Sequence, residues 1–218
     1  MLEIAQNCVN LHDMSLREYI EKEILPQYEN YDPAHRLDHI NAVISRSADL
    51  AKNYDVDEQM VYAIAAYHDH GVCEGRELHH LSSARMMRED KNLRQWFSEE
   101  QIEIMAQAVE DHRASAKSAP RSVYGKIVAE ADRQIDADTI VRRTIEYGLG
   151  HYPQYSQSEQ FERFKEHIQE KYAAGGYLKI WIPGGENDLK LKAFQKEIEK
   201  PGRLEEMFDY WYEKLSRK

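Results

Sequence analysis

The sequence is poor in cysteine, has no long apolar run and carries no positive charge excess. Its two cysteines, Cys8 and Cys73, cannot form a framework of several disulfides, so reduced thiols are expected. No apolar stretch approaches the roughly 18 residues that a membrane span requires. The first residues, MLEIAQNCVNLHD, show neither a basic nor an apolar leader region. We therefore expect a cytoplasmic protein without a membrane partner.

The net charge of −10 argues against a non-specific grip on duplex nucleic acid, because such binding relies on Lys and Arg to neutralise phosphates. The balance changes between residues 113 and 143, where seven Lys and Arg oppose four acids, giving a local charge of +3. This stretch is either a site for a small anionic ligand or a solvated basic surface. Duplex nucleic acid is thus not an expected partner, whereas a small anion and a homodimer both stay open.

Hydrophobic periodicity is helical along most of the chain. Ser15 with Glu18 and Ser98 with Gln101 have the spacing of N-terminal capping boxes. Helices are predicted at residues 15–31, 37–53, 56–70, 80–90, 98–113, 121–147 (with a break near 134), 158–174 and 187–200. The segment GGYLKIWIPGG is either a short strand or an extended lid. We expect an all-α protein, with one domain at residues 1–150 and a mostly helical elaboration at 151–218 packed on it.

Polar side chains stand where helical periodicity calls for aliphatic core residues. His68, for example, continues the apolar series of Val61 and Ile64. The residues of this kind, on four separate segments, are His39, His68, His112 and Asp132. A charge buried without a partner is costly, so each is either hydrogen-bonded separately or part of a metal site. With Asp69 beside His68, they offer the mixed imidazole and carboxylate shell that suits Mn, Fe, Ni, Mg or Zn.

Three ordered segments, RLDHI, YHDHG and AEADR, resemble the HD superfamily of metal-dependent phosphohydrolases, in which His…His-Asp…Asp hold a divalent metal. The resemblance covers roughly residues 30 to 140 and extends to HHLSSARMM and SVYGKIVAEADR, which look like connecting elements of small stand-alone bacterial HD proteins that act on nucleotides. It implies an HD-type helical domain whose metal ligands are His39, His68, Asp69 and Asp132.

The sequence departs from the family pattern directly after the dyad, where His70 replaces a small or apolar residue. Members with two metals use further histidines in the region where His79, His80 and His112 lie, and His80 and His112 are the best candidates for that role. One or two divalent ions are therefore both compatible with the resemblance.

The implied reaction is hydrolysis of a phosphoester or phosphoanhydride of a nucleotide, or of a similar small phosphorylated metabolite, by a metal-activated water. The candidate groups for proton transfer are Asp69, Glu74 and His112. The candidate groups for binding the substrate phosphate are His35, His80, Lys117 and Arg133. Among these, the planar guanidinium of Arg133 matches an oxyanion best, although a surface salt bridge is an equal alternative for it.

Two other functions stay open. A di-iron oxygenase of HD-like fold needs two iron ions, and so requires the additional histidines to be ligands. A non-catalytic nucleotide sensor is expected to have lost an essential ligand, and none is missing from this sequence.

Overall fold

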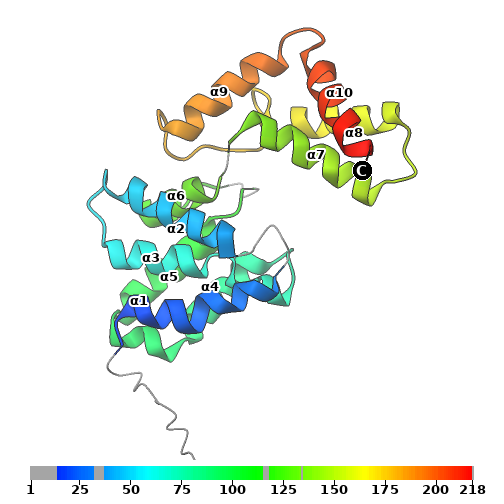
Figure 1. Ribbon diagram of the computed structural model, residues 1–218. Helices are drawn as coiled ribbons and strands as arrows, with labels where there is room; N and C mark the ends of the chain where they lie inside the picture. The colour runs from blue at the N-terminus through cyan, green and yellow to red at the C-terminus, as the bar shows by residue number, and fades with distance from the viewer. Residues whose placement is uncertain (1–13, 32–36, 115–117, 134, 218) are drawn as a thin grey trace, which may run out of the picture. The chain divides into compact units, whose positions relative to one another are not determined.

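Every regular element in the described part of the chain is helical (Figure 1). The computed structural model describes residues 14–31, 37–114, 118–133 and 135–217. The predicted all-α class is therefore confirmed. In chain order the elements are α1 (Leu16–Tyr19), η2 (Ile20–Ile24), η3 (Leu25–Asn30), α2 (Leu37–Ala51), α3 (Glu58–Tyr67), η4 (His70–Glu74), α4 (His79–Glu89), η5 (Lys91–Gln95), α5 (Glu99–Asp111), α6 (Val123–Asp132), α7 (Ala137–His151), α8 (Gln157–Tyr172), α9 (Glu186–Ile198) and α10 (Arg203–Ser216).

The chain divides into two compact units between Asp132 and Arg133. Elements α1 to α6 form the first unit and α7 to α10 form the second. The segment expected to be helical at 121–147 is thus two helices, α6 and α7, as the predicted break implies. Helix α7 packs against α8 and α10 of the second unit. A domain boundary at residue 150, with the later part packed on the earlier one, stays a prediction.

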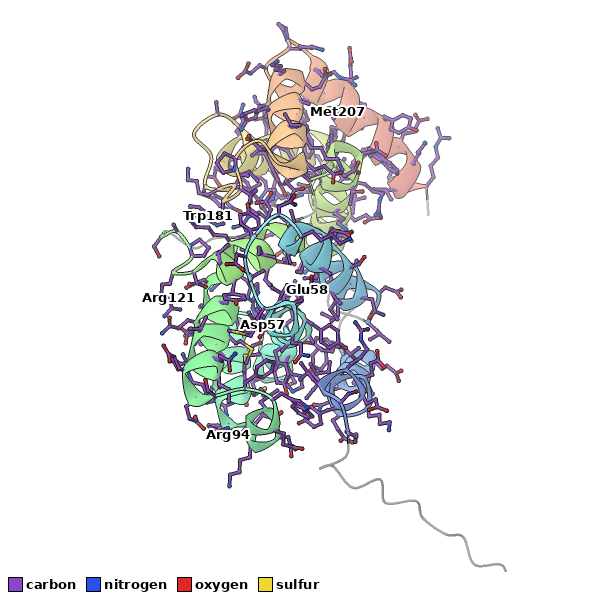
Figure 2. All side chains as sticks on the ribbon, turned by 90° about the vertical axis from the view of Figure 1, so that its left-hand side faces the viewer. Asp57, Glu58, Arg94, Arg121, Trp181 and Met207 are labelled. Carbon is purple, nitrogen blue, oxygen red and sulfur yellow. The ribbon has the colours of Figure 1, made fainter. Side chains whose placement is uncertain are left out.

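Helix α3 lies at the centre of the first unit. Ala63, Ala65 and Ala66 are fully buried, and the small side chains let α2, α5 and α6 pack around it. A helix that is apolar on nearly every side is stable only when neighbours surround it. Asp57 caps its first turn by accepting hydrogen bonds from the backbone N–H groups of residues 59 and 60 (Figure 2). Asp57 therefore fixes the N-terminal end of α3, and the C-terminal end of α3 leaves the core at residue 68.

The second unit has a separate core built largely from aromatic rings. Phe208 of α10 lies 5.2 Å from the ring of Phe161 and 5.4 Å from that of Phe164, both on α8 (ring centroids). Helix α10 was not predicted from the sequence, and it supplies the central ring of this core. GGYLKIWIPGG forms neither strand nor helix in the structure. The aromatic contacts hold α8 and α10 together without any residue of the first unit.

Both predicted capping boxes are present. The Ser15 hydroxyl accepts from the Glu18 N–H while the Glu18 carboxylate accepts from Ser15, and Ser98 and Gln101 repeat the exchange at α5. Such caps satisfy backbone donors that a helix leaves unpaired in its first turn. Among the described helices, none combines the length and the apolar character that a bilayer crossing demands.

Candidate metal centre

Five helix ends bring the polar residues of the first unit together. His68 and His112 directly follow the last turns of α3 and α5, Asp132 closes α6, and His39 and His79 stand in the first turns of α2 and α4. The C-terminal end of a helix carries partial negative charge, so the three ends at His68, His112 and Asp132 favour a cation between them. Their position past the regular helix explains how polar groups can face inward without breaking the core.

One group of ligand atoms surrounds one carboxylate oxygen of Asp69. Asp69 Oδ2 lies 3.2 Å from His68 Nε2 and 3.5 Å from His39 Nε2. Asp132 Oδ1 lies 3.2 Å from the same nitrogen of His39 and 3.8 Å from that of His68. The four residues predicted to hold a metal are therefore brought together. Among them, His39, His68 and Asp69 each offer a ligand atom within 4.8 Å of the others.

A second group surrounds the other oxygen of the same carboxylate. Asp69 Oδ1 lies 3.3 Å from His79 Nε2 and 3.4 Å from His112 Nε2. These three residues also meet the spacing of a metal site. Asp69 is buried and belongs to both groups, so its carboxylate connects two adjacent sets of donor atoms.

Backbone hydrogen bonds orient three of the imidazoles. The Nδ1 atom lies within hydrogen-bond distance of the carbonyl three residues earlier, at 2.8 Å in His68, 2.7 Å in His79 and 2.5 Å in His112. A carbonyl only accepts, so each Nδ1 carries the hydrogen, and a neutral ring then has a lone pair on Nε2. All three Nε2 atoms face Asp69. This is the tautomer and orientation that a metal-binding histidine needs.

The donor set fits a divalent cation. His68 Nε2 is buried and makes no hydrogen bond, and the Nε2 atoms of His79 and His112 face each other at 3.1 Å. Two lone pairs at that distance repel unless a proton or a cation is shared between them. Neutral imidazoles and carboxylates together suit Mn, Fe, Ni or Zn. The residues present therefore fit the group that the sequence resemblance implies.

Hydrogen bonds and charges within this cluster shift the pKa values of its histidines and carboxylates. Burial lowers the pKa of His39, but hydrogen bonds with Asp132 and Asp69 outweigh it and raise that pKa to about 9. Burial raises the pKa of Asp132, but the His39 hydrogen bond and the charge of His68 lower it to about 2. The pKa of Asp69 is likewise lowered well below its ordinary value, burial being outweighed by His68 and His112. The arrangement thus stabilises positive charge between the carboxylates.

Residues 36–134 match the family model of the HD domain. These residues therefore form an HD domain. An HD domain indicates, in general terms, a hydrolase with a bound divalent metal. The matched range begins just before α2 and ends just after α6, so it contains both groups of ligand atoms in full.

The comparison with solved structures finds the crystal structure of a predicted HD superfamily hydrolase from an uncultured Thermotogales bacterium. The two chains are 22% identical, the match covers 72% of this chain and 92% of the other, and the TM-score is 0.45. The comparison with curated proteins gives no match.

Tyrosine hydroxyls fix the backbone of the HD domain on both sides of the His68–Asp69 dyad. Tyr28 donates to the carbonyl of residue 66 at 2.7 Å, and Tyr31 donates to the carbonyl of residue 70 at 2.8 Å. The first contact is fully buried, so loss of the donor would leave a buried carbonyl unsatisfied. The two hydrogen bonds hold the chain where it leaves α3, which is the point at which the dyad projects its side chains.

Gly71 allows η4 to lie directly on α4. A Cβ atom at this position would lie 2.6 Å from the backbone of His79 and 2.4 Å from that of Ser83. These distances are too short for any side chain to fit. The Gly71 N–H also donates to the Ser83 hydroxyl at 2.8 Å. This close approach brings the start of α4, and with it His79, up to the dyad.

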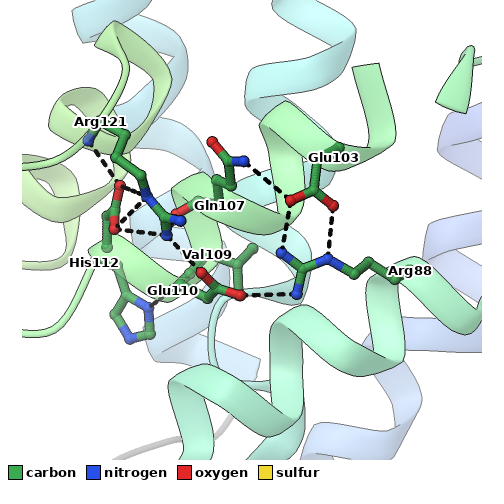
Figure 3. A network of polar contacts seen from close by, with 8 residues as sticks. Arg88, Glu103, Gln107, Val109, Glu110, His112 and Arg121 are labelled. Carbon is green, nitrogen blue, oxygen red and sulfur yellow. Dashed lines mark hydrogen bonds and ion pairs between the residues drawn. The ribbon is translucent and has the colours of Figure 1, made fainter. Parts of the chain in front are cut away.

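An ion-pair network fixes the end of α5, where His112 stands (Figure 3). Arg88 of α4 bonds both Glu103 and Glu110 of α5, at 2.8 and 2.7 Å. Arg121 bonds Glu110 and Asp111, the two residues that precede His112. The network therefore ties α4, α5 and the segment before α6 together beside the second group of ligand atoms.

His79 is the member of the HD domain's cluster that sequence reasoning missed. His80 was preferred for a second ion, but the Nε2 atom that faces Asp69 belongs to His79. Periodicity alone gave no clear signal, because Ser83 and Ala84, four residues after His79 and His80, are both buried. His80 is next to His112 and Arg113, and burial together with their charges lowers its pKa to about 4.

The remaining predicted residues lie elsewhere or outside the described residues. Glu74 is exposed and its carboxylate accepts from Arg85 at 2.6 Å. Arg133 opens the second unit, with its guanidinium 6.0 Å from the centroid of the Trp181 ring. His35 and Lys117 fall outside the described residues. A role for these four residues in catalysis or substrate binding stays a prediction.

Proposed function

We propose that this protein is a metal-dependent phosphohydrolase that cleaves a phosphoester or phosphoanhydride bond of a nucleotide or a similar small phosphorylated metabolite. The observation that carries the proposal is the pair of donor groups that share the Asp69 carboxylate. A phosphoryl group carries negative charge that increases on the leaving oxygen, and a site built for positive charge stabilises it. The HD domain supports the same reaction class.

The residues that would hold the cations follow from the two groups. His39, His68, Asp69 and Asp132 would hold one, and Asp69, His79 and His112 would hold a second. When bound, a divalent cation supplies charge neutralisation and lowers the pKa of a water molecule toward neutrality. As a ligand, His112 would not be available for the proton transfer that the sequence predicts for it, and another group would have to carry out that step.

Exposure indicates from which side the substrate reaches this site. The side chains of His68, Asp69 and His112 are at most 5% exposed, whereas those of His39 and Asp132 are 25% and 23% exposed. The phosphoryl group would therefore approach over His39 and Asp132. His80, whose pKa is lowered to about 4, is neutral at pH 7 and would act on a substrate as a hydrogen-bond donor and not as a cation.

The experiment that tests this proposal is a substrate screen. The full-length protein, loaded with Mn²⁺, is incubated with nucleoside mono-, di- and triphosphates, and release of phosphate and pyrophosphate is measured. Asp69→Ala is expected to abolish release, while Asp49→Ala, which removes an exposed carboxylate on α2, is expected to leave it unchanged. Activity that survives Asp69→Ala would reject the mechanism. Nucleotide binding without any release would identify a sensor.

A di-iron oxygenase is a second candidate function that is compatible with the geometry. The specific observation in its favour is the Asp69, His79 and His112 group, which supplies the additional histidines that a two-metal site requires. Elemental analysis of the purified protein decides between the two. Two iron ions per chain and oxygen consumption with an organic substrate would favour the oxygenase, whereas phosphate release without oxygen consumption would favour the hydrolase.

A further inference from the structure

Arg163 on α8 is a half-buried cation of the second unit that no carboxylate of the described residues pairs with. Its guanidinium lies over the rings of Tyr147 and Tyr152, at 5.8 and 5.9 Å from their centroids. Its Nη2 donates to the carbonyl of Thr144, and its Nε is buried without an acceptor. A charge removed from water is normally compensated by an opposite charge, so this position calls for an anion.

A histidine and a lysine continue from Arg163 along the same side of α8. His167 and Lys171 follow at intervals of four residues, which places the three on one side of the helix. The charged groups that face His167 are Arg163 and Lys171, and both lower its pKa together with burial. Arg143 is exposed on the adjoining α7. Its charge opposes the rise that burial causes in the pKa of Tyr172, at the far end of this row. Eight residues of helix span about 12 Å, enough for about two phosphate groups of an extended strand.

Aromatic rings flank the row of cations at its Arg163 end. Tyr147 stacks on His151 with ring centroids 3.9 Å apart and an interplanar angle of 15°. Tyr152 and Tyr155 stack at 5.1 Å and 22°. Tyr147 is 51% exposed and Tyr155 is 37% exposed, so ring surface remains open to a ligand. Paired, exposed ring faces beside a guanidinium are the elements with which proteins bind unstacked bases and their phosphates.

The charge of the whole chain does not oppose an anionic ligand here. Residues 133–218 contain 15 Lys and Arg and 15 Asp and Glu, so the net charge of −10 lies entirely in residues 1–132. Arg142 is paired with Glu146 at 2.8 Å, but Arg143 makes no ion pair among the described residues. Arg143 and Arg163, neither of which forms an ion pair with a carboxylate of the described residues, thus stand on the neighbouring helices α7 and α8 of an otherwise neutral unit.

We propose that this face of the second unit, formed by Arg143, Tyr147, Tyr152, Tyr155, Arg163 and His167, binds a short single strand of nucleic acid. The bases stack on the tyrosine rings, and the phosphates lie along the cations of α7 and α8. A duplex is not accommodated in this way, because its bases already stack on one another. An acidic peptide would use the cations but would leave the ring faces unused.

Fluorescence anisotropy with the full-length protein tests this proposal. A labelled 12-nucleotide oligothymidylate is titrated at low and at moderate salt, beside a hairpin duplex and a polyglutamate peptide as competitors. The single strand is expected to bind, to weaken as salt increases, and to resist both competitors. Binding of the duplex or of the peptide at equal strength would overturn the proposal, as would no binding at low salt.

Two pairs of exposed positions provide matched variants. Arg143→Gln and Tyr147→Ala are each expected to weaken oligonucleotide binding about tenfold. Arg142→Gln, the paired arginine next in sequence, and Tyr210→Ala, an equally exposed tyrosine on α10, are expected to leave it unchanged. Equal losses in all four variants would assign binding to another surface. None of the four residues belongs to the metal cluster, so the outcome is independent of the proposed hydrolase activity.

Discussion

The two units are both built from helices, yet they place polar residues in opposite ways. The first unit carries the entire net charge of −10 and buries His68, Asp69 and His112 where its helices end. The second unit is neutral, closes its core with phenylalanine rings, and leaves tyrosines and arginines on its surface.

This difference shows that a helical core can hold chemistry in two ways. In the first unit the functional groups replace core residues, so the site requires the whole unit to fold around it. In the second unit exposed groups such as Arg143 and Tyr147 stand outside the core and can be replaced without removing a core side chain. Variants that change one unit at a time therefore test both the metal site of the first unit and the surface site of the second.

The largest effect is expected from a change in the core of the second unit. Phe208 is 1% exposed and contacts rings on α8. Phe208→Ala is expected to reduce the free energy of unfolding of that unit by about 3–5 kcal/mol, because a large cavity replaces the ring. Circular dichroism melts measure the loss, and calorimetric titration with Mn²⁺ is expected to show unchanged binding by the first unit. Loss of Mn²⁺ binding in parallel would show that the units fold as one. Tyr210→Ala, two residues away and exposed, serves as the control.

The next effect separates the two groups of ligand atoms within the first unit. Asp69→Asn is expected to weaken Mn²⁺ binding at both groups by at least about 100-fold, because one carboxylate serves both. Asp132→Asn is expected to weaken only the group that includes His39 and His68. Titration calorimetry measures the number of bound ions and their affinities. Identical losses in the two variants would contradict the assignment of separate groups.

A smaller effect concerns the tyrosine that holds the end of α3. Tyr28→Phe leaves the carbonyl of residue 66 buried without a donor and is expected to cost about 1–3 kcal/mol of stability. Because that carbonyl precedes the dyad, Mn²⁺ affinity is expected to fall as well. Tyr124→Phe removes a hydroxyl that accepts from the N–H of residue 57 at the other end of α3. If both variants lowered Mn²⁺ affinity equally, Tyr28 would have only a structural role.

The smallest effect is a pH dependence at the surface network of the first unit. The hydrogen bond from Arg88 lowers the pKa of Glu103 to about 2. A carboxyl group whose pKa is lowered on folding stabilises the protein above its unfolded pKa of about 4.3 and loses this contribution as pH falls toward 2. Wild type is therefore expected to exceed Glu103→Gln in stability by up to about 1 kcal/mol at pH 6. Urea unfolding at pH 6 and pH 2.5 measures the difference, and a difference that persists at pH 2.5 would contradict the assignment.

Most of the candidate metal ligands could be identified in the sequence because they interrupt apolar periodicity. His68 and His112 continue the inward series of α3 and α5, and the structure buries both. The choice between His79 and His80 could not be made in this way, because both precede inward positions of α4, and the approach of η4 at Gly71 decided which one faces Asp69. Helix α10 was missed although its sequence carries a helical signal, because Leu204, Phe208 and Trp211 stand at the i, i+4 and i+7 positions of one apolar stripe.

The order of helices, their caps and the residues that replace core positions were determined by the amino-acid sequence alone, because these features depend on neighbours within a few residues. Only the tertiary structure decided that one carboxylate stands between two sets of imidazoles, and that Arg163 of α8 lies beside the rings of Tyr147 and Tyr152. Such proximities join residues dozens of positions apart, and packing between helices sets them. A local sequence pattern does not show which distant residues will lie close together.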